Sequence, residues 1–575
     1  MKKLASLILA VVMVLSMTVA AFAEETNYTI TVKHQSGTNV SLAGNTYKAY
    51  KLFDVTYNTE RDAYAYTIAS EFENFSYSRV RGEDLIEYVA GLGNNSEELN
   101  AFAQSVFSYI TENNIAFKAS EKVAEGADSV VLNVGEPGYY LVSGTATTEN
   151  GESVIAACAL NTAAPNTEVN VKADAPSLEK KIIENDKPVD ANNAAIGDTV
   201  HYQITSKVPN MTGYEKYYFI VNDTLSSGLD FNPTASDPET EPDLQGNPEI
   251  TIGDKKLVYG TDYTIEFSER ANKTDPTSFS IIFKNFVQYK DQVGADIVID
   301  YTAVINENAV IGSEGNDNVA KLEYSNNPNV TPNGDPENPD KPGPDDPKGE
   351  TPEDRVITYV TGIELIKVDG NDGDRLVGAE FEIKGDKINK VKVIKETFEE
   401  DTNGKYYKLT DGTFTIDEPA EENDDKYEST TVKYKKTQVV EWNETTETVS
   451  ATGIVGTDGV LRFDGLAEGT YTITEVVAPN GYNLLEEPIS VTITCTEPQN
   501  VDVTDTAEWK YSATGNGLNI TNGDLNTDGR IELSIANFAG TLLPSTGGIG
   551  TTIFYAAGII LMAGAVFFVV RRKRA

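Results

Sequence analysis

Three segments in the C-terminal part of the chain each carry one polar side chain among apolar ones. The polar residues are Lys367, Glu475 and Asn537, and each has apolar residues two and four positions before it. Successive side chains of a strand point to opposite faces, so each polar residue shares the buried face of its strand. A lone buried lysine, carboxylate or amide is costly, so three of them in one region need a common explanation.

An amide-forming reaction supplies that explanation. Burial lowers the pKa of a lysine and raises the pKa of a carboxyl group, which yields a neutral amine and a protonated acid. The amine of Lys367 can then attack the side-chain amide of Asn537 while Glu475 polarises it, and ammonia leaves. The product is a Lys–Asn isopeptide bond between the first and the last strand of this region.

An upstream region repeats the order of lysine, acid and asparagine. Lys180, Asp223 and Asn326 each lie in phase with apolar residues, and here an aspartate takes the acid role. Lys181 and Asn327 are the neighbouring alternatives, and strand phase favours Lys180 and Asn326. Each bond would close a loop of more than about 100 residues, which in the loop-entropy model stabilises a fold by about 5 kcal/mol.

A salt bridge or a surface position is the ordinary interpretation of any single lysine beside a core strand. The same order of residue types in two regions favours crosslinks instead. The N-terminal region departs from this order, because its equivalent of the Glu475 strand, residues 138–144, contains no carboxylate. We therefore expect no isopeptide bond in that region.

The two ends of the chain carry targeting signals. Residues 1–23 combine two lysines, an apolar run and Ala21-Phe22-Ala23, which predicts a secretory signal peptide cleaved after Ala23. Near the other end, residues 552–570 are uncharged and, as a helix, roughly match a hydrocarbon core of about 30 Å. The basic residues behind them predict a cytoplasmic tail, so everything upstream lies outside the cell.

Five residues ahead of that apolar span spell a short motif: Leu543, Pro544, Ser545, Thr546 and Gly547. The motif, the span and the basic tail together resemble the cell-wall sorting signal of Gram-positive surface proteins. The resemblance implies that a sortase cysteine cuts between Thr546 and Gly547 and that an amine then takes the acyl group of Thr546.

The crosslink regions extend this resemblance. Three segments resemble parts of a collagen-adhesin B-type domain: the segment with Lys367, the run 469–479 around Glu475 and the Ile535-Ala-Asn537 strand. The upstream segments at 176–182, 196–200, 222–226 and 324–328 resemble the isopeptide-forming second domain of fimbrial backbone subunits. Lys172, out of phase with Val169 and Val171 and so facing solvent, lies at the seam where such subunits carry their pilin-motif lysine. Asn170-Val171 replaces the usual aromatic-proline pair before it.

Short strands separated by turn signals predict an all-β chain of tandem immunoglobulin-like sandwiches. Helical periodicity at 82–92 and 96–113 predicts some helix in the N-terminal region. The expected organisation runs from the signal peptide to the sorting signal, with a polar insertion at roughly 384–455. Its parts are a signal peptide at 1–23, an N-terminal pilin domain at 24–172, an isopeptide-forming domain at 173–327, a proline-rich extended linker at 328–353, a collagen-adhesin B-type domain at 354–540 and the sorting signal at 541–575.

Composition excludes several function classes. The net charge of −43 argues against binding nucleic acid or an anionic membrane surface. Two distant cysteines and two histidines give neither a disulfide framework nor a histidine-rich metal site. The run Asp524 to Asp528 resembles half of a calcium loop, but Ile535 stands where a bidentate glutamate is needed, so a turn is the better interpretation. We expect no cofactor and no metal.

The resemblance therefore implies a structural shaft subunit of a sortase-polymerised pilus, anchored to the cell wall, that supports adhesion and is not an enzyme. The expected partners are a pilin-class sortase, a housekeeping sortase, further copies of the chain head to tail, minor pilins, peptidoglycan and an unknown host or extracellular ligand. The alternative is a monomeric, wall-anchored adhesin with the same domain types.

Overall fold

The computed structural model describes residues 27–540, with internal gaps, and Met562. The gaps are residues 36–37, 59, 62, 95, 149–150, 157, 232–247, 269–274, 386–389, 422–423, 445–449, 499–500, 502–506, 516, 519–521, 524 and 527. The predicted signal peptide and the LPSTG motif lie outside the described residues.

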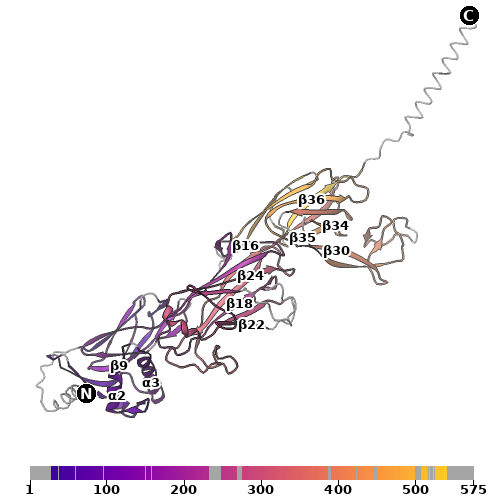
Figure 1. The fold of residues 1–575 in the computed structure, drawn as a ribbon. Helices are drawn as coiled ribbons and strands as arrows, with labels where there is room; N and C mark the ends of the chain where they lie inside the picture. The colour runs from indigo at the N-terminus through magenta and orange to yellow at the C-terminus, as the bar shows by residue number, and fades with distance from the viewer. Residues whose placement is uncertain are drawn as a thin grey trace, which may run out of the picture. The chain divides into compact units, whose positions relative to one another are not determined.

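The chain divides into two compact units, one formed by residues 1–360 with 496–508 and the other by residues 361–495 with 509–575. Figure 1 shows both units built almost entirely of strands, with helices gathered near the N-terminus in indigo. The predicted fold class, mostly β with some helix in the N-terminal region, is confirmed.

The N-terminal region packs two helices against a curved sheet. Alternating apolar residues of β3 and β9 face the helices α2 and α3, and Phe53, Phe72 and Phe102 are buried between them. Ser96 caps α3, because its hydroxyl accepts a hydrogen bond from the Leu99 amide at 3.1 Å.

The elements of this region are β1 (Thr29–Lys33), β2 (Val40–Ser41), β3 (Thr46–Asn58), β4 (Ala63–Ile68), η1 (Ser70–Phe72), β5 (Ser76–Tyr77), β6 (Val80–Arg81), α2 (Glu83–Ala90), α3 (Glu97–Asn113), β7 (Ala119–Lys122), β8 (Ser129–Asn133), β9 (Gly138–Ser143), β10 (Thr145–Thr148), β11 (Ser153–Ile155), β12 (Ala159–Ala163) and β13 (Asn166–Asn170). The main sheet has the order β12-β9-β3-β4, and a second has the order β13-β1-β8.

The middle region is a sandwich of two sheets, in the orders β15-β14-β17-β24-β20-β21 and β16-β27-β25-β18-β23-β22. Strict alternation of buried and partly exposed residues along β17 and β24 marks the faces that meet in the core. Its elements are β14 (Glu179–Glu184), β15 (Lys187–Val189), β16 (Ala191–Asn193), β17 (Thr199–Lys207), β18 (Phe219–Leu225), β19 (Leu229–Asp230), β20 (Glu249–Ile252), β21 (Lys255–Lys256), β22 (Tyr263–Phe267), β23 (Thr277–Phe283), η2 (Phe286–Gln292), β24 (Asp296–Ile305), β25 (Asn316–Ser325), β26 (Lys348–Glu350) and β27 (Asp354–Tyr359).

The proline-rich stretch at 328–353, predicted to be an extended linker, is folded onto this sandwich. The carboxylate of Asp346 accepts backbone hydrogen bonds from Asn333, Gly334 and Gly343 at 2.7–2.8 Å, which closes the stretch into a compact loop. β26 near the end of the stretch and β27 directly after it both pair with β25. The boundary of the compact unit therefore falls after residue 360 and not at 353, because these strands complete the sheet of the middle region.

The C-terminal unit is a second sandwich, with sheets in the orders β33-β30-β35-β28-β40 and β34-β29-β36-β37-β38-β39. Its elements are β28 (Thr361–Asp369), β29 (Glu380–Gly385), β30 (Lys390–Glu400), β31 (Tyr407–Lys408), β32 (Phe414–Thr415), β33 (Tyr434–Glu444), β34 (Ser450–Ile454), β35 (Val460–Leu466), β36 (Gly469–Val477), β37 (Ile489–Thr496), β38 (Glu508–Thr514), β39 (Asn522–Gly523) and β40 (Ile531–Asn537). The predicted polar insertion forms the long β30–β33 hairpin, which extends away from the sandwich in Figure 1.

Two further expectations concern the end of the chain. Asn526 accepts hydrogen bonds from the amides of Asp528 and Arg530, both at 3.0 Å, as a turn before β40 requires; Asp524 lies outside the described residues. Within the described part of the chain, no helix is long and apolar enough to span a membrane. The predicted span at 552–570 lies outside that part except for Met562.

Candidate crosslinking and assembly sites

In the C-terminal unit, strand order brings the lysine beside the asparagine. Lys367 on β28 and Asn537 on β40 belong to neighbouring parallel strands, in which Lys367 aligns with Ile535. Glu475 comes from β36 in the facing sheet. The three side chains therefore meet between the sheets, where Lys367 and Asn537 are at most 1% exposed.

The three groups are within contact distance. Lys367 Nζ donates to Asn537 Oδ1 at 2.6 Å and lies 3.8 Å from Glu475 Oε1. Asn537 Nδ2 donates to both carboxylate oxygens of Glu475 at 3.0 Å. Burial lowers the pKa of Lys367 to about 8, so much more neutral amine is present near neutral pH than for an ordinary lysine.

A short loop closes this site from outside. Asn537 Nδ2 also donates to the carbonyl oxygen of Asn483 at 2.9 Å, and the Leu485 amide donates to Glu475 Oε2 at 2.9 Å. These bonds fix the amide and the carboxylate together, and they leave the amide carbonyl oxygen facing the lysine.

In the middle region, the lysine and the acid come from facing sheets. Lys180 on β14 donates through Nζ to Asp223 Oδ2 on β18 at 2.5 Å. Tyr301 on β24 joins both groups, because its hydroxyl donates to Asp223 Oδ2 at 2.7 Å and accepts from Lys180 Nζ at 2.7 Å. All three side chains are almost completely buried.

The asparagine at this site differs from the predicted one. Asn318 on β25 is fully buried, and its Nδ2 donates to the Tyr301 hydroxyl at 2.8 Å. Asn326 lies beyond the end of β25, half-buried, and its Nδ2 donates to the Lys348 carbonyl at 2.7 Å. The structure therefore places Asn318 in the cluster in place of the predicted Asn326, because β25 ends at Ser325 and Asn326 lies past its end.

Two buried oxygens at this site lack a hydrogen-bond partner, Asp223 Oδ1 and Asn318 Oδ1. Both can only accept while the acid is ionised, so a proton on Asp223 would supply the missing donor. Burial, opposed by Lys180, raises the pKa of Asp223, and burial, opposed by Asp223, lowers the pKa of Lys180. The site therefore favours the neutral forms of both groups.

Lys181 and Asn327, the alternatives left open by the sequence, are not at this cluster. Lys181 points to the other face of β14, where its Nζ pairs with Asp190 Oδ1 at 2.5 Å and stays partly exposed. Asn327 Oδ1 accepts from the Asn329 amide at 3.0 Å within the segment that follows β25.

The N-terminal region holds one buried lysine of a different kind. Lys51 pairs with Asp54 and, at 2.7 Å, with Glu136, and both carboxylates are about half exposed. Burial lowers its pKa, but the hydrogen bonds to the two carboxylates outweigh burial and leave the pKa above its ordinary value. Lys51 is thus a charged, paired lysine, which favours the expectation of no crosslink here.

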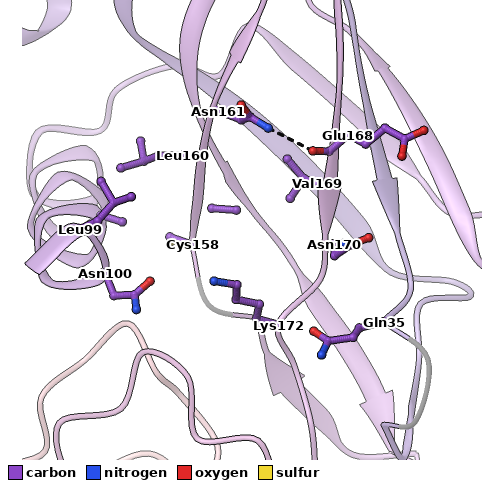
Figure 2. Close-up of a pocket in the computed structure, with 12 residues that line it drawn as sticks. Gln35, Leu99, Asn100, Cys158, Leu160, Asn161, Glu168, Val169, Asn170 and Lys172 are labelled. Carbon is purple, nitrogen blue, oxygen red and sulfur yellow. Dashed lines mark hydrogen bonds between the residues drawn. The ribbon is translucent and has the colours of Figure 1, made fainter. Parts of the chain in front are cut away.

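Lys172 lies in a pocket of about 380 Å³ beside α3. Val169 and Val171 are buried, so the predicted alternation holds, but Lys172 is half-buried and not on an open face. The reason is that Leu99 and Asn100 of α3 cover part of that side, and Figure 2 shows the lysine side chain directed into the pocket. Burial lowers the pKa of Lys172.

The remaining predicted site residues, 543–547, lie outside the described residues. Across the part of the chain that the structure describes, no cluster of three or more His, Cys, Asp or Glu side chains could hold a metal ion. Cys158 is a buried free thiol, and Cys495 is partly buried. Sequence reasoning missed Asn318 and Tyr301; the alternation Asn316, Asn318, Ala320 along β25 was the available signal.

Comparisons with known proteins match three parts of the chain. Residues 196–328 match the family of Gram-positive pilin backbone subunit 2, Cna-B-like domain. Residues 426–507 match a prealbumin-like fold domain, and residues 539–575 match the LPXTG cell wall anchor motif.

Similar individual proteins are pilus or surface proteins. The trypsin-resistant surface T6 protein of Streptococcus pyogenes serotype M6 is 28% identical over 415 residues, which is 70% of each chain. Solved structures include the T6 backbone pilin of the same organism (17% identity, 91% of this chain and all of the other, TM-score 0.48). Another is the major pilin SpaD of Corynebacterium diphtheriae (15% identity, 91% and 100% coverage, TM-score 0.42).

Pilin-type β domains followed by an LPXTG anchor define a cell-wall-anchored surface protein. Together with the similarity to the T6 protein, these matches support a backbone subunit of a Gram-positive, sortase-assembled pilus. It is a structural shaft protein and not an enzyme, and the anchor implies sortase processing, polymerisation with other pilins and linkage to peptidoglycan.

Proposed function

We propose that two isopeptide bonds crosslink each copy of the subunit internally and that a third amide bond joins it to the next copy. The internal bonds are Lys180–Asn318 and Lys367–Asn537. The observation that carries this proposal is the contact of 2.6 Å between Lys367 Nζ and Asn537 Oδ1 in a fully buried site.

The reaction at the C-terminal unit needs no outside reagent. The neutral amine of Lys367 attacks Cγ of Asn537, the Cγ–Nδ2 bond breaks, and ammonia leaves with the proton that the amine loses. Both carboxylate oxygens of Glu475 accept hydrogen bonds from Nδ2 of Asn537. Glu475 therefore lies where it can pass the proton from the amine to the leaving nitrogen. In the middle region, Asp223 and Tyr301 take this part.

The joining reaction is the work of a pilin-class sortase. Its cysteine cuts between Thr546 and Gly547, and the amine of Lys172 on another copy attacks the resulting thioester, which releases the cysteine thiol. Head-to-tail repetition builds the fibre, minor pilins join it, and a housekeeping sortase attaches its base to peptidoglycan. The half-buried Lys172 supports this role, because its lowered pKa favours a nucleophilic amine.

These joints define a path for tension. Force would enter at Lys172, cross from Lys180 to Asn318, and cross again from Lys367 to Asn537 before it reaches Thr546. Residues 27–171 lie outside this path and would carry no tension, so they need no crosslink to resist it. We propose three domains on this basis, at 24–172, 173–360 and 361–540, the second extended by the folded proline-rich stretch.

The polymer is tested with wall extracts boiled in detergent. Wild type should give a ladder of high-mass species, which Lys172→Ala removes and Lys33→Ala, a partly exposed lysine on the neighbouring strand β1, retains. A single band from wild type would contradict the polymer and favour a monomeric, wall-anchored adhesin.

A further inference from the structure

Large apolar side chains are exposed at the end of the C-terminal unit, close to its crosslinking site. They are Val476, Val477, Leu484 and Phe538, and between 43% and 54% of each is exposed. Single exposed apolar residues are ordinary, but a group of large ones marks an interaction surface. We call these four residues the end patch.

Hydrogen bonds hold the three segments of the end patch together. The Asn483 amide donates to the carbonyl of Phe538 at 3.1 Å, which joins the loop that carries Leu484 to the segment that carries Phe538. The Leu485 amide bonds the carboxylate of Glu475, the residue before Val476. The ring of Phe538 also lies across Gly370, where an added Cβ would come within 2.4 Å of it. The three segments that carry the end patch are thus fixed to one another.

The chain leaves the C-terminal unit at this surface. The Gly540 amide donates to the carbonyl of Gly481 at 3.1 Å, on the loop that carries Leu484. Thr546 is only the sixth residue after Gly540. Fully extended, they span about 20 Å, so in a head-to-tail fibre the end patch must lie within roughly that distance of Lys172 on the next copy, plus one lysine side chain.

We propose that the end patch docks on the face around Lys172 of a second copy and forms the non-covalent part of the joint between subunits. The inference rests on the proposed Thr546–Lys172 bond. Four side chains are fewer than the 20–30 residues of a side in a stable free interface. A short tether, however, gives an effective concentration of about 1 mM, at which a weak contact is occupied.

Hydroxyl-radical labelling of intact fibres tests this contact. Wild-type fibres are compared with wall-released monomers of the Lys172→Arg variant, which keeps the whole end patch. Phe538 and Leu484 should be labelled severalfold less in fibres than in monomers. Ile416, which is 64% exposed in the β30–β33 insertion, is the matched control and should be labelled equally in both.

Two results would overturn the inference, and they are distinguishable. Equal labelling of Phe538 in both samples, with a branched Thr546–Lys172 peptide present in the fibres, would leave the covalent polymer intact and reject the docking surface. Fibres without that branched peptide would reject the proposed function and the docking surface with it.

Discussion

The two crosslinking sites assemble the same residue types from different strands. In the C-terminal unit, Lys367 and Asn537 come from neighbouring parallel strands of one sheet, and the acid comes from the sheet opposite. In the middle region, Lys180 comes from one sheet, whereas Asp223 and Asn318 come from neighbouring strands of the other. One bond would thus join strands within a sheet and the other would join the two sheets.

The second difference is the use of a tyrosine. Lys367 reaches Asn537 directly, whereas Lys180 contacts the acid and reaches Asn318 only through the Tyr301 hydroxyl. What both sites share is a lysine that burial pushes toward its neutral form. Both sites thus hold a desolvated lysine in one buried cluster with an acid and an asparagine, although the strands that supply these residues differ.

The largest expected effect concerns the choice of asparagine in the middle region. Asn318→Ala should remove the Lys180 crosslink, so the mass of the intact chain should show the loss of one ammonia fewer. Because the crosslink no longer closes a loop, the free energy of unfolding of the middle region should fall by about 5 kcal/mol. Asn326→Ala is the matched control, because that side chain bonds only near the surface. Intact mass and thermal unfolding check both variants; a crosslink lost in Asn326→Ala and kept in Asn318→Ala would break the comparison.

The next effect is the pH dependence of a chain without the C-terminal bond. In Asn537→Ala, Lys367 stays a buried amine with a pKa of about 8, against about 10.4 when unfolded. Between these values the unfolded chain binds a proton that the folded chain does not. The free energy of unfolding should therefore rise with pH, by about 3 kcal/mol in total.

Urea denaturation at a series of pH values measures that rise. The wild-type chain is the control, since an amide nitrogen does not titrate and Lys367 would add no slope. The same slope in both chains would mean that wild-type Lys367 is still a free amine.

A smaller effect should separate the two sites. Tyr301→Phe removes the hydroxyl that Lys180, Asp223 and Asn318 share, and each unsatisfied buried group costs about 1–3 kcal/mol. Bond formation in the middle region should slow by roughly tenfold, which corresponds to 1.4 kcal/mol, while the C-terminal bond forms normally. Time-resolved mass analysis during refolding measures both, with Tyr263→Phe as the control, because that buried hydroxyl donates to the Pro248 carbonyl. An unchanged rate would remove Tyr301 from the mechanism.

The smallest effect is expected in the N-terminal region. Lys51→Met should leave the number of ammonia losses unchanged and alter stability by less than about 1 kcal/mol, because its partners Asp54 and Glu136 are half exposed. Intact mass of this variant would reveal a third crosslink if one existed, since the loss of an ammonia would then disappear.

Strand phase in the sequence was enough to predict five of the seven residues that the structure places in the two clusters. It missed Asn318 because several asparagines lie in phase near β25, and the choice depends on where that strand begins and ends. Pairing with β26 and β27, residues far along the chain, sets those limits. Tyr301 was missed because an in-phase aromatic residue looks like any core residue.

The predictions for the proline-rich stretch and for Lys172 were limited for the same reason, because both depend on contacts with residues distant in the sequence. Composition predicted an extended linker at 328–353, but one carboxylate, that of Asp346, gathers three backbone amides and closes the stretch into a loop. Alternation predicted the correct face for Lys172, yet α3, which covers part of that face, comes from residues 97–113. The alternation of residues along a strand predicts the face on which a side chain lies. Tertiary packing determines which other residues that side chain contacts.

Tandem mass spectrometry of digested, purified fibres would show directly whether amide bonds crosslink this subunit internally and join it to its neighbours. The account predicts three branched peptides, which join Thr546 to Lys172, Lys180 to Asn318 and Lys367 to Asn537. Linear peptides alone, with free amines on Lys172, Lys180 and Lys367, would contradict it.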